Sequence, residues 1–439
     1  MSGSSDVSLT NTEGGMASLT TATPVFAACS FGGQILPITA FTVSGGAYGT
    51  TGRANFRTSI TALKALNINL YDLSVSSGPS VEVLAYANYG NNTQPARIFG
   101  GEYLNTTWSY EDDLVEIAAR DYLGVLVDQH RLPTRLNQAL IQWANVGQSA
   151  NSFGVEIQNQ LLSSVVEAIA NEFGLTPIVQ LNSNPILGIQ YGSVDRVFTT
   201  VPQNLYTILQ TLALNSGYET FGTPKKQLYF GLPGIGQNVL NVAYKVGTQQ
   251  LTNSNTRPTP VPCKNIEIEH QPRRNATFSV IVISQDFAKA KPTKGYATVV
   301  APGIPSFTAG IHSGPDAIST NMALRTKGLQ VPLYTFHEEG LTADQTSAKA
   351  AAIAMDIAKR AVIVSFDIDG YIDMLPTKQV KLLGDVDAAF AAMDFYVTAY
   401  QHTFTMPSGR GGGGGGGFKT HVKSWNVAEA ALDKGGLGG

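Results

Sequence analysis

The sequence predicts an α+β protein that is mainly β, in which two small antiparallel β-barrels are joined by an α+β segment. Two regions contain short runs of alternating apolar and polar residues separated by Gly- and Asn-rich turns, a pattern typical of small barrels. The region between them has apolar residues at the i, i+3, i+4 spacing of amphipathic helices. Because 439 residues are many for one hydrophobic core, we expect several domains.

The expected organisation follows the changes in composition and periodicity along the chain. Four parts are predicted: a flexible Ser/Thr/Gly-rich N-terminal arm (1–24), a first β-barrel (25–131), a helical α+β middle domain (132–245) and a second β-barrel (246–439). The last part contains three distinct segments: an irregular Pro/Gly/Lys-rich insertion (286–334), a helix with a small-residue apolar face (342–361) and a seven-glycine hairpin loop (411–417).

The charge composition argues against nucleic acid as the main partner. Charged residues make up 14% of the chain and the formal net charge is −3. A nucleic-acid-binding protein needs a basic face or tail, so we expect no sequence-specific nucleic-acid binding. Low charge together with 45 glycines favours a β-rich architecture with extensive contacts between chains.

The sequence predicts neither secretion nor membrane insertion. The N-terminus lacks the basic and apolar regions of a signal peptide. No run of about 18 apolar residues occurs, so no stable membrane anchor is expected and the protein should be made, soluble, in a cytoplasm. The two cysteines, Cys29 and Cys263, have no metal-ligand spacing and are expected to be reduced, packed thiols.

The first β region shows short strands separated by turns. Strands are expected at residues 25–30, 34–43, 81–89, 96–99 and 102–104, whereas residues 54–66 fit either a strand or a short helix. We expect a polar turn at residues 105–107.

A change of period marks the end of the first β region. Residues 114–121 alternate between apolar and mostly polar side chains, as in a strand with one buried face. From Tyr122 onward, Leu123, Leu126 and Val127 follow helical spacing. Asp121 lies at this junction, where its carboxylate can cap the short helix.

Two amphipathic helices are predicted in the middle domain. The first should begin near Ser164, which has capping-box spacing to Glu167, and end at Gly174. The second spans about residues 203–216 and ends at Gly217. A strand at residues 227–230 follows the turn after the second helix.

The C-terminal part returns to the period of strands. Strands are expected at residues 277–284, 362–368, 379–382, 395–404 and 418–425, and an alternating segment begins near Cys263. The helix at residues 342–361 precedes the second of these strands.

Several of these stretches resemble, in the same order, the tail hub proteins of phages. The sequence ARDYLGVLVD at residues 119–128 is similar to the end of that family's first barrel, and EFGL at residues 172–175 to the end of a helix. The most specific match is GYE at residues 217–219 followed by LYFG at residues 228–231. Tyr396, Val397, His402 and THV at residues 420–422 resemble the C-terminal barrel. The resemblance covers about residues 80–425, with residues 286–334 unmatched.

The resemblance to the late-control-D and baseplate-hub family, whose relatives form the trimeric base of type VI secretion spikes, implies a structural function. It implies a homotrimeric ring that joins a six-fold tail tube to a three-fold central spike and forms part of the channel for tape measure and DNA. The implied partners are the tube or tube-initiator protein, the spike, the tape measure and other baseplate proteins. The implied location is the baseplate of a virion assembled in the host cytoplasm.

The residues themselves predict no catalytic, cofactor-binding or metal site. The six histidines match no zinc motif: His130, His270, His312, His337, His402 and His421. His402 and His421 fall on neighbouring predicted strands, where they could approach each other, and a packing or surface function is favoured. GLPGIG at residues 231–236 lacks the Lys-Ser/Thr of a phosphate loop. DIDG at residues 367–370 lacks the remaining ligands of a calcium loop.

Two alternatives to a tail hub stay open. One is another structural protein: a distal tail protein, a tube initiator or a secretion-system hub. The other is a cell-wall-degrading enzyme, which is disfavoured because the chain ends soon after the last barrel strand.

The hub hypothesis makes a prediction about shape. Residues 25–131 and the C-terminal β segments should have the same strand order despite little sequence identity, because matching a six-fold tube needs similar shapes. The middle domain, which has no second copy, should lie away from the tube-facing ring.

Overall fold

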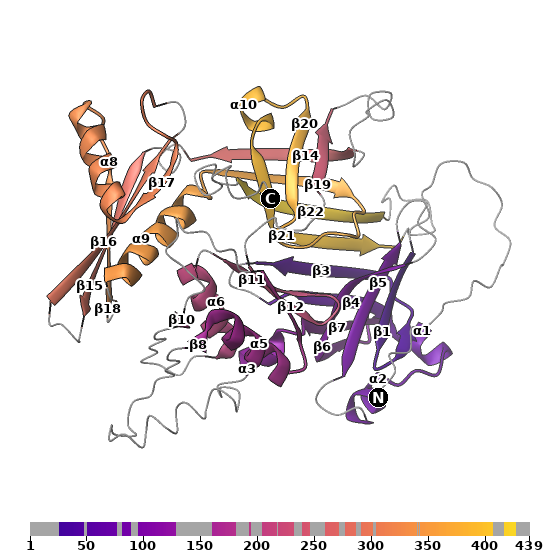
Figure 1. Cartoon of the computed structure of the whole chain (residues 1–439). Helices are drawn as coiled ribbons and strands as arrows, with labels where there is room; N and C mark the ends of the chain where they lie inside the picture. The colour runs from indigo at the N-terminus through magenta and orange to yellow at the C-terminus, as the bar shows by residue number, and fades with distance from the viewer. Residues whose placement is uncertain are drawn as a thin grey trace, which may run out of the picture.

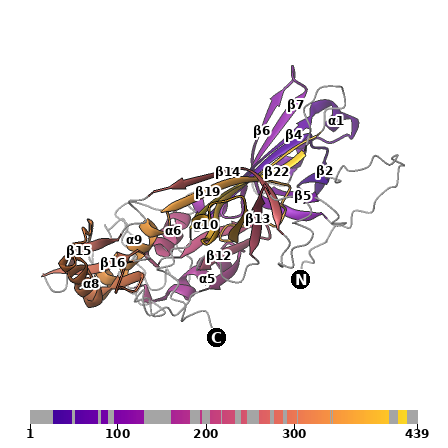
Figure 2. The same ribbon diagram turned by 90° about the horizontal axis from the view of Figure 1, so that it is seen from above.

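The computed structural model describes residues 26–47, 51–76, 81–88, 95–128, 160–180, 193–194, 204–216, 218–231, 239–245, 260–271, 277–286, 291–301, 304–339, 341, 343–406 and 417–426. The predicted N-terminal arm and residues 411–416 of the seven-glycine loop lie outside these ranges. The described residues form a mainly β structure with helices, as the sequence predicts. Figures 1 and 2 show that the first β region and the layer formed by strands β15 (Phe278–Asp286) to β18 (Leu333–Glu339) occupy opposite ends of the molecule.

Seven antiparallel strands form the first β region, in the order β2-β1-β5-β6-β7-β4-β3. Their bounds are β1 Phe26–Phe31, β2 Gln34–Leu36, β3 Ala40–Gly46, β4 Arg53–Ser59, β5 Glu82–Asn88, β6 Ala96–Ser109 and β7 Leu114–Asp121. Helices α1 (Ile60–Ala65) and α2 (Leu70–Ser76) follow β4 and contribute side chains to the hydrophobic core of the first β region. Strands β2 and β3, at the two ends of this order, are consecutive parts of the chain joined by residues 37–39, so the strand order returns on itself around one hydrophobic core, as in the predicted barrel.

Two local predictions for this region need correction. The turn expected at residues 105–107 is wrong, because β6 continues through them to Ser109 and pairs with β7 throughout. The chain turns instead at residues 110–113. Residues 54–66 form both predicted alternatives in succession: β4 ends at Ser59, whose hydroxyl accepts a hydrogen bond from the Ala62 amide and so caps α1.

The second β region is a closed barrel of six strands. The strands are β13 Leu240–Tyr244, β14 Val261–His270, β19 Val362–Asp369, β20 Gln379–Gly384, β21 Asp394–Thr405 and β22 Gly417–Asn426. They run in the order β20-β13-β14-β19-β22-β21, and β21 closes the barrel on β20; the one-turn helix α10 (Ala388–Ala391) joins β20 to β21. Unlike the predicted barrel, it is not wholly antiparallel, since β13 is parallel to both β14 and β20. Strand β13 lies within residues 132–245, which were expected to form the middle domain.

The middle segment packs helices on a small sheet. Its elements are α3 Gly124–Asp128, β8 Gln160–Leu161, α5 Leu162–Glu172, β9 Thr176–Gln180, β10 Ser193–Val194, α6 Leu205–Ser216, β11 Glu219–Thr223 and β12 Gln227–Gly231. Apolar residues from α3, α5 and α6 form one buried core with β12. Helix α5 begins at Leu162, so Ser164 lies inside it and the predicted capping box does not start the helix.

The segment expected to be an irregular insertion is largely ordered. Strands β15 (Phe278–Asp286), β16 (Lys291–Val300), β17 (Gly310–Ser313) and β18 (Leu333–Glu339) form a sheet with helix α8 (Gly314–Thr326). Helix α9 (Ala343–Ala358) covers this sheet with its buried alanines. A Cβ on Gly295 would lie 2.0 Å from the carbonyl carbon of Thr346. This glycine, which lies in the stretch expected to be irregular, therefore allows α9 to approach β16 closely.

The two β regions share one strand order. In the first, the neighbouring strands are β3-β4-β7-β6-β5, and in the second they are β14-β19-β22-β21-β20. Numbered along the chain within each set of five, both orders are first-second-fifth-fourth-third. Every one of these pairs is antiparallel. The predicted likeness is therefore confirmed in order and direction for these five strands of each region, which we call repeat 1 and repeat 2; outside them, β1 lies antiparallel to β5 whereas β13 lies parallel to β20.

Candidate functional site

The candidate site is the junction where both repeats and the middle segment meet, and it is built around strand β21. Its first residues, Asp394–Tyr396, pair with β20, whereas Ala399–Thr405 pair with β3 of repeat 1. The change of partner occurs at Thr398, the extra residue of a β-bulge against β22. Strand β21 of repeat 2 thus also pairs with repeat 1 and joins the two repeats into one sheet (Figure 1).

Residue-level features of the two repeats coincide when their bulges are aligned. Leu104 is the extra residue of the bulge between β6 and β7, as Thr398 is between β21 and β22. The residue before each bulge donates an equivalent hydrogen bond. In repeat 1 the Tyr103 amide donates to the carbonyl of Val81, which directly precedes β5, at 2.9 Å. In repeat 2 the Val397 amide donates to the carbonyl of Lys378, which directly precedes β20, at 2.8 Å. The repeats therefore match in local geometry as well as in topology.

The end of the shared strand packs into the core of repeat 1. The Phe404 and Phe418 rings lie 5.4 Å and 5.9 Å from the Phe41 ring, in stacked and edge-on arrangements. All three belong to the hydrophobic core of repeat 1. Burial of aromatic rings at such distances is strongly stabilising, so the two repeats share a core as well as a sheet.

A neutral histidine lies inside this joint. His402 is fully buried between Tyr400 and Phe418, and its Nδ1 is 2.9 Å from the Thr420 hydroxyl. Burial lowers the pKa of His402 to about 3, so the ring is uncharged at neutral pH. His421 lies on the neighbouring strand but faces the opposite side, where its Nδ1 is 2.7 Å from Asp367. The two histidines therefore do not meet.

Asp121 is a buried carboxyl group at the centre of the junction. Its Oδ2 accepts a hydrogen bond of 2.6 Å from the Gly52 amide, and its Oδ1 accepts one of 3.1 Å from Leu123, as expected for a cap of α3. Burial raises the pKa of Asp121 to about 7 against these hydrogen bonds, which lower it. In repeat 2 the equivalent residue is Asn426, whose side-chain oxygen accepts from the Val362 amide at 2.9 Å.

We expect Asp121→Asn to remove a pH dependence of stability. A carboxyl group with a raised pKa binds its proton more tightly in the folded state, so its stabilising contribution is complete below pH 3.8 and is lost as the pH rises to about 7. The free energy of unfolding of the native protein should fall relative to the variant by up to about 4 kcal/mol across this range. Urea unfolding at a series of pH values measures this, and parallel curves would contradict it.

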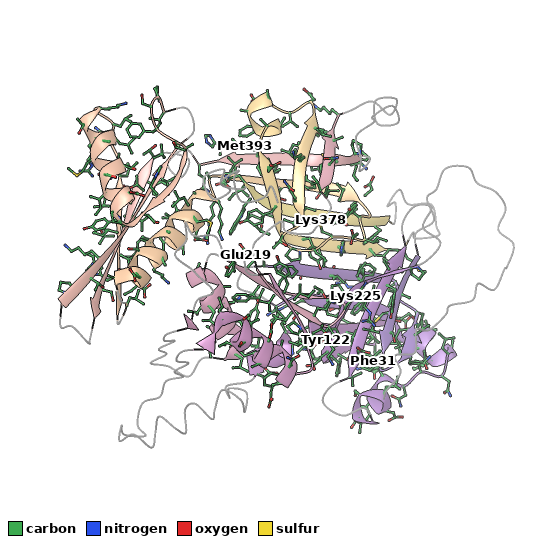
Figure 3. The ribbon with its side chains drawn as sticks, viewed as in Figure 1. Phe31, Tyr122, Glu219, Lys225, Lys378 and Met393 are labelled. Atoms are coloured by element: carbon green, nitrogen blue, oxygen red, sulfur yellow. The ribbon has the colours of Figure 1, made fainter. Side chains whose placement is uncertain are left out.

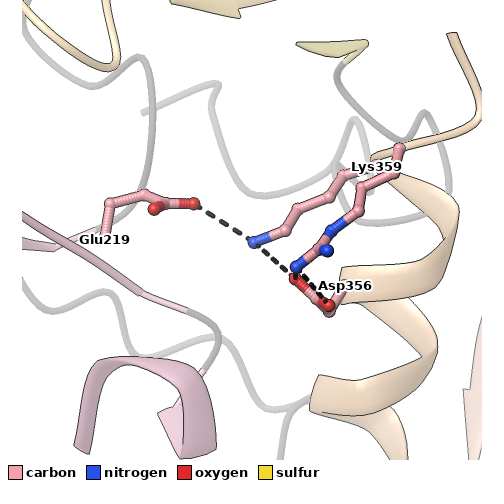
Figure 4. Close-up of polar contacts among 4 residues, drawn as sticks. Glu219, Asp356 and Lys359 are labelled. Carbon is pink, nitrogen blue, oxygen red and sulfur yellow. Dashed lines mark hydrogen bonds and ion pairs between the residues drawn. The ribbon is translucent and has the colours of Figure 1, made fainter. Parts of the chain in front are cut away.

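A buried ion-pair network joins the middle segment to α9. The Lys359 Nζ lies 3.2 Å from Glu219 on β11 and 3.2 Å from Asp356 on α9, which also pairs with Arg360 at 2.8 Å (Figure 4). Glu219 and Lys359 are 1% and 9% exposed. The Arg360 guanidinium lies 4.8 Å from the Trp425 ring on β22, so the network reaches the second barrel. Figure 3 shows Glu219 between the middle segment and the second barrel.

Two hollows adjoin this network. One, of about 200 Å³, is lined by Ala47, Tyr218, Glu219 and Lys359, among others. The other is a wider groove of about 910 Å³ between α9, β18 and the end of β14, and its lining includes Tyr334, Phe336 and Ile353. Glu219 and Asp356, two carboxylates that line the smaller hollow, are both ion-paired with Lys359 and belong to the network.

The other candidate residues from the sequence are buried, paired with a neighbouring side chain or outside the described residues. Cys29 and Cys263 are buried free thiols, as expected. Asp367 and Asp369 pair with His421 and Lys264 on the barrel surface. Residues 232–236 of the glycine-rich stretch lie outside the described residues. Over the described ranges, no group of three or more His, Cys, Asp or Glu side chains could hold a metal ion. No described helix is long and apolar enough to cross a membrane.

Solved structures, but no family models or curated sequences, are similar to this chain. No family model matches the sequence, and no curated protein does. The fold is that of phage tail proteins, so the resemblance seen in the sequence is confirmed at the level of fold.

Two solved structures carry that statement. The tail protein from Neisseria meningitidis has a TM-score of 0.57 at 10% identity, and the match covers 92% of this chain and 98% of that one. The 43 kDa tail protein of prophage MuSo2 from Shewanella oneidensis has a TM-score of 0.54 at 12% identity, with 93% and 99% covered.

Proposed function

We propose that this protein is the structural hub of a phage tail baseplate, a trimeric adaptor between the six-fold tail tube and the three-fold central spike. The observation that supports this most is the pair of repeats with one strand order, held in one sheet through β21. Three chains would present six similar β regions to the tube and keep three-fold symmetry toward the spike. A single chain can serve both symmetries only if its two repeats are alike in shape.

The proposed hub would line part of a channel and contact several tail proteins. The ring would enclose part of the channel for tape measure and DNA, and its wall should carry little positive charge, because basic walls would bind the passing phosphates. The partners are the tube or tube-initiator protein, the central spike and neighbouring baseplate proteins, in the tail of a virion. The middle segment and the β15–β18 layer would lie away from the tube, since each is present once per chain.

The proposed function is non-enzymatic, and two rival classes make different predictions. A distal tail protein, a tube initiator or a secretion-system spike hub would share the fold, and the neighbouring genes distinguish these, since a baseplate hub lies beside spike and tube genes. A cell-wall-degrading enzyme would clear a peptidoglycan zymogram. Clearing by the purified protein would contradict the structural proposal.

The purified protein is expected to be a homotrimer with large interfaces between chains. Light scattering coupled to size-exclusion chromatography should give the mass of three chains over a range of concentrations. A mass that stays at one chain at the highest concentration, or that corresponds to six chains, would contradict the proposed adaptor.

A further inference from the structure

One stretch of repeat 1 has a sheet edge that no other described strand covers. Strand β5 pairs with β6 only as far as Glu102, and the following residues of β6 pair with β7 alone among the described strands. This free edge, Leu104 to Ser109, exposes large apolar side chains: Leu104 is 45% and Trp108 38% exposed. An uncovered edge of this kind is a template for pairing with another chain.

The corresponding stretch of repeat 2 is covered, and it shows what such an edge binds. Alignment of the bulges matches Thr106 with Tyr400 and Trp108 with His402. In repeat 2 these positions are 6% and 1% exposed, because residues 399–405 pair with β3. The fourth strand of repeat 2 therefore pairs with the first strand of repeat 1.

The first strand of repeat 2 has an open edge as well. This strand, β14, pairs with β19 on one side, and on the other side β13 covers only Val261–Cys263. Along residues 265–270 no described strand lies on that side. Ile268, which faces Val364 across the β14–β19 pair, occupies the position of Val43, which faces Ala54 in repeat 1. Each repeat thus has a first strand and a fourth strand suited to the same kind of joint.

We propose that β6 of one chain pairs, antiparallel, with β14 of the next chain, repeating between chains the joint that β21 and β3 form within the chain. The occupant of each free edge is a second copy of this protein, and the inference rests on the proposed trimer. The internal joint sets the register: Gln401 faces Ser44 and His402 faces Val43. The equivalent pairs between chains are Thr107 with Glu269 and Trp108 with Ile268.

The two edges belong to different repeats, so the contact is head-to-tail and can close into a ring. In that ring the joints would alternate between those within a chain and those between chains, and each would join a first strand to a fourth strand. Trp108 would become buried against Ile268, as His402 is buried near Val43. The sheet would then be continuous around three chains, with neither edge exposed.

Cysteine pairs test the register directly. Thr107→Cys with Glu269→Cys places two thiols at directly opposed positions, where the Cα separation of about 4.5–5.5 Å suits a disulfide. The matched control is Thr107→Cys with Glu267→Cys, because Glu267 would be a diagonal neighbour at about 7–8 Å, outside the usual range. The native cysteines are buried and supply no exposed thiol. Oxidised protein is analysed on non-reducing gels alongside its mass in solution.

We expect covalent dimers and trimers from the opposed pair, at least about tenfold more than from the diagonal pair. A trimer in solution without these links would overturn the inferred joint and leave the proposed trimer standing. Equal linking of both pairs would overturn the register. A chain that stays monomeric would contradict the proposed function and the joint together.

A second variant tests the same surface without disulfide chemistry. Trp108→Asp should raise the concentration needed for trimer formation by at least about tenfold, since a charge would enter the joint. The control is Tyr71→Asp on α2, a 71% exposed aromatic residue outside either edge. Both variants should keep the melting temperature of the isolated chain. Equal trimerisation of the two variants would overturn the proposal.

Discussion

Replacing Leu123 with aspartate is expected to yield a chain that does not fold. The Leu123 side chain is fully buried, in the core that α3 shares with α5 and α6. The sequence pattern places Leu123 in the short helix that ends the first barrel (25–131), whereas the structure places its side chain in the core of the middle segment. An unpaired charge at such a position costs several kcal/mol, which is comparable with the total stability of a typical domain, about 5–15 kcal/mol.

The measurement compares Leu123→Asp with Leu66→Asp. Leu66 is 58% exposed at the end of α1, so the same change there should alter the free energy of unfolding little. Circular dichroism and thermal melting of soluble protein measure both. A soluble Leu123→Asp protein that melts with the native protein would show that the assignment of this core is wrong.

Lys359→Met is expected to destabilise the fold by about 3–5 kcal/mol, because it leaves the Glu219 carboxylate buried without its ammonium partner. Asp356 keeps its contact with Arg360, so the loss falls mainly on Glu219. The double variant Glu219→Gln with Lys359→Met should recover much of the loss, because no charge is then buried without a partner at this position.

An exposed ion pair supplies the control for this second experiment. Lys381 lies 3.3 Å from Asp394, and their side chains are 48% and 39% exposed. Lys381→Met should therefore change the free energy of unfolding by no more than about 1 kcal/mol. Urea unfolding of the four proteins measures the differences. Similar losses from Lys359→Met and Lys381→Met would contradict the importance of the buried pair.

Local sequence patterns predicted much of the secondary structure because they depend on neighbouring residues. The buried stripe of α6, with Leu205, Ile208, Leu209 and Leu212, follows directly from helical spacing. The capping function of Asp121 was also predictable, since an acidic residue stands between a strand and a helix. Alternation likewise predicted the strands of both repeats.

The junction was not predictable because strand alternation does not say which strands are neighbours. Nothing in the sequence of β21 indicates that its second half pairs with β3, more than 350 residues earlier in the chain. The Glu219–Lys359 pair is 140 residues apart and has no local signal. Residues 286–334 were expected to be irregular because Pro, Gly and Lys interrupt the alternation of apolar residues in β16. In the structure Ala297 and Val299 of this strand are buried, and Gly295 lies against α9.

Imaging the purified assembly by electron microscopy, viewed along its axis, tests the central claim most directly. The account predicts three chains, with six similar β regions in one ring and the middle segments and β15–β18 layers outside it at three-fold positions. Repeats 1 and 2 should alternate around the ring and superpose in strand order. A ring of six chains, or a trimer whose two repeats face opposite sides, would contradict the adaptor account.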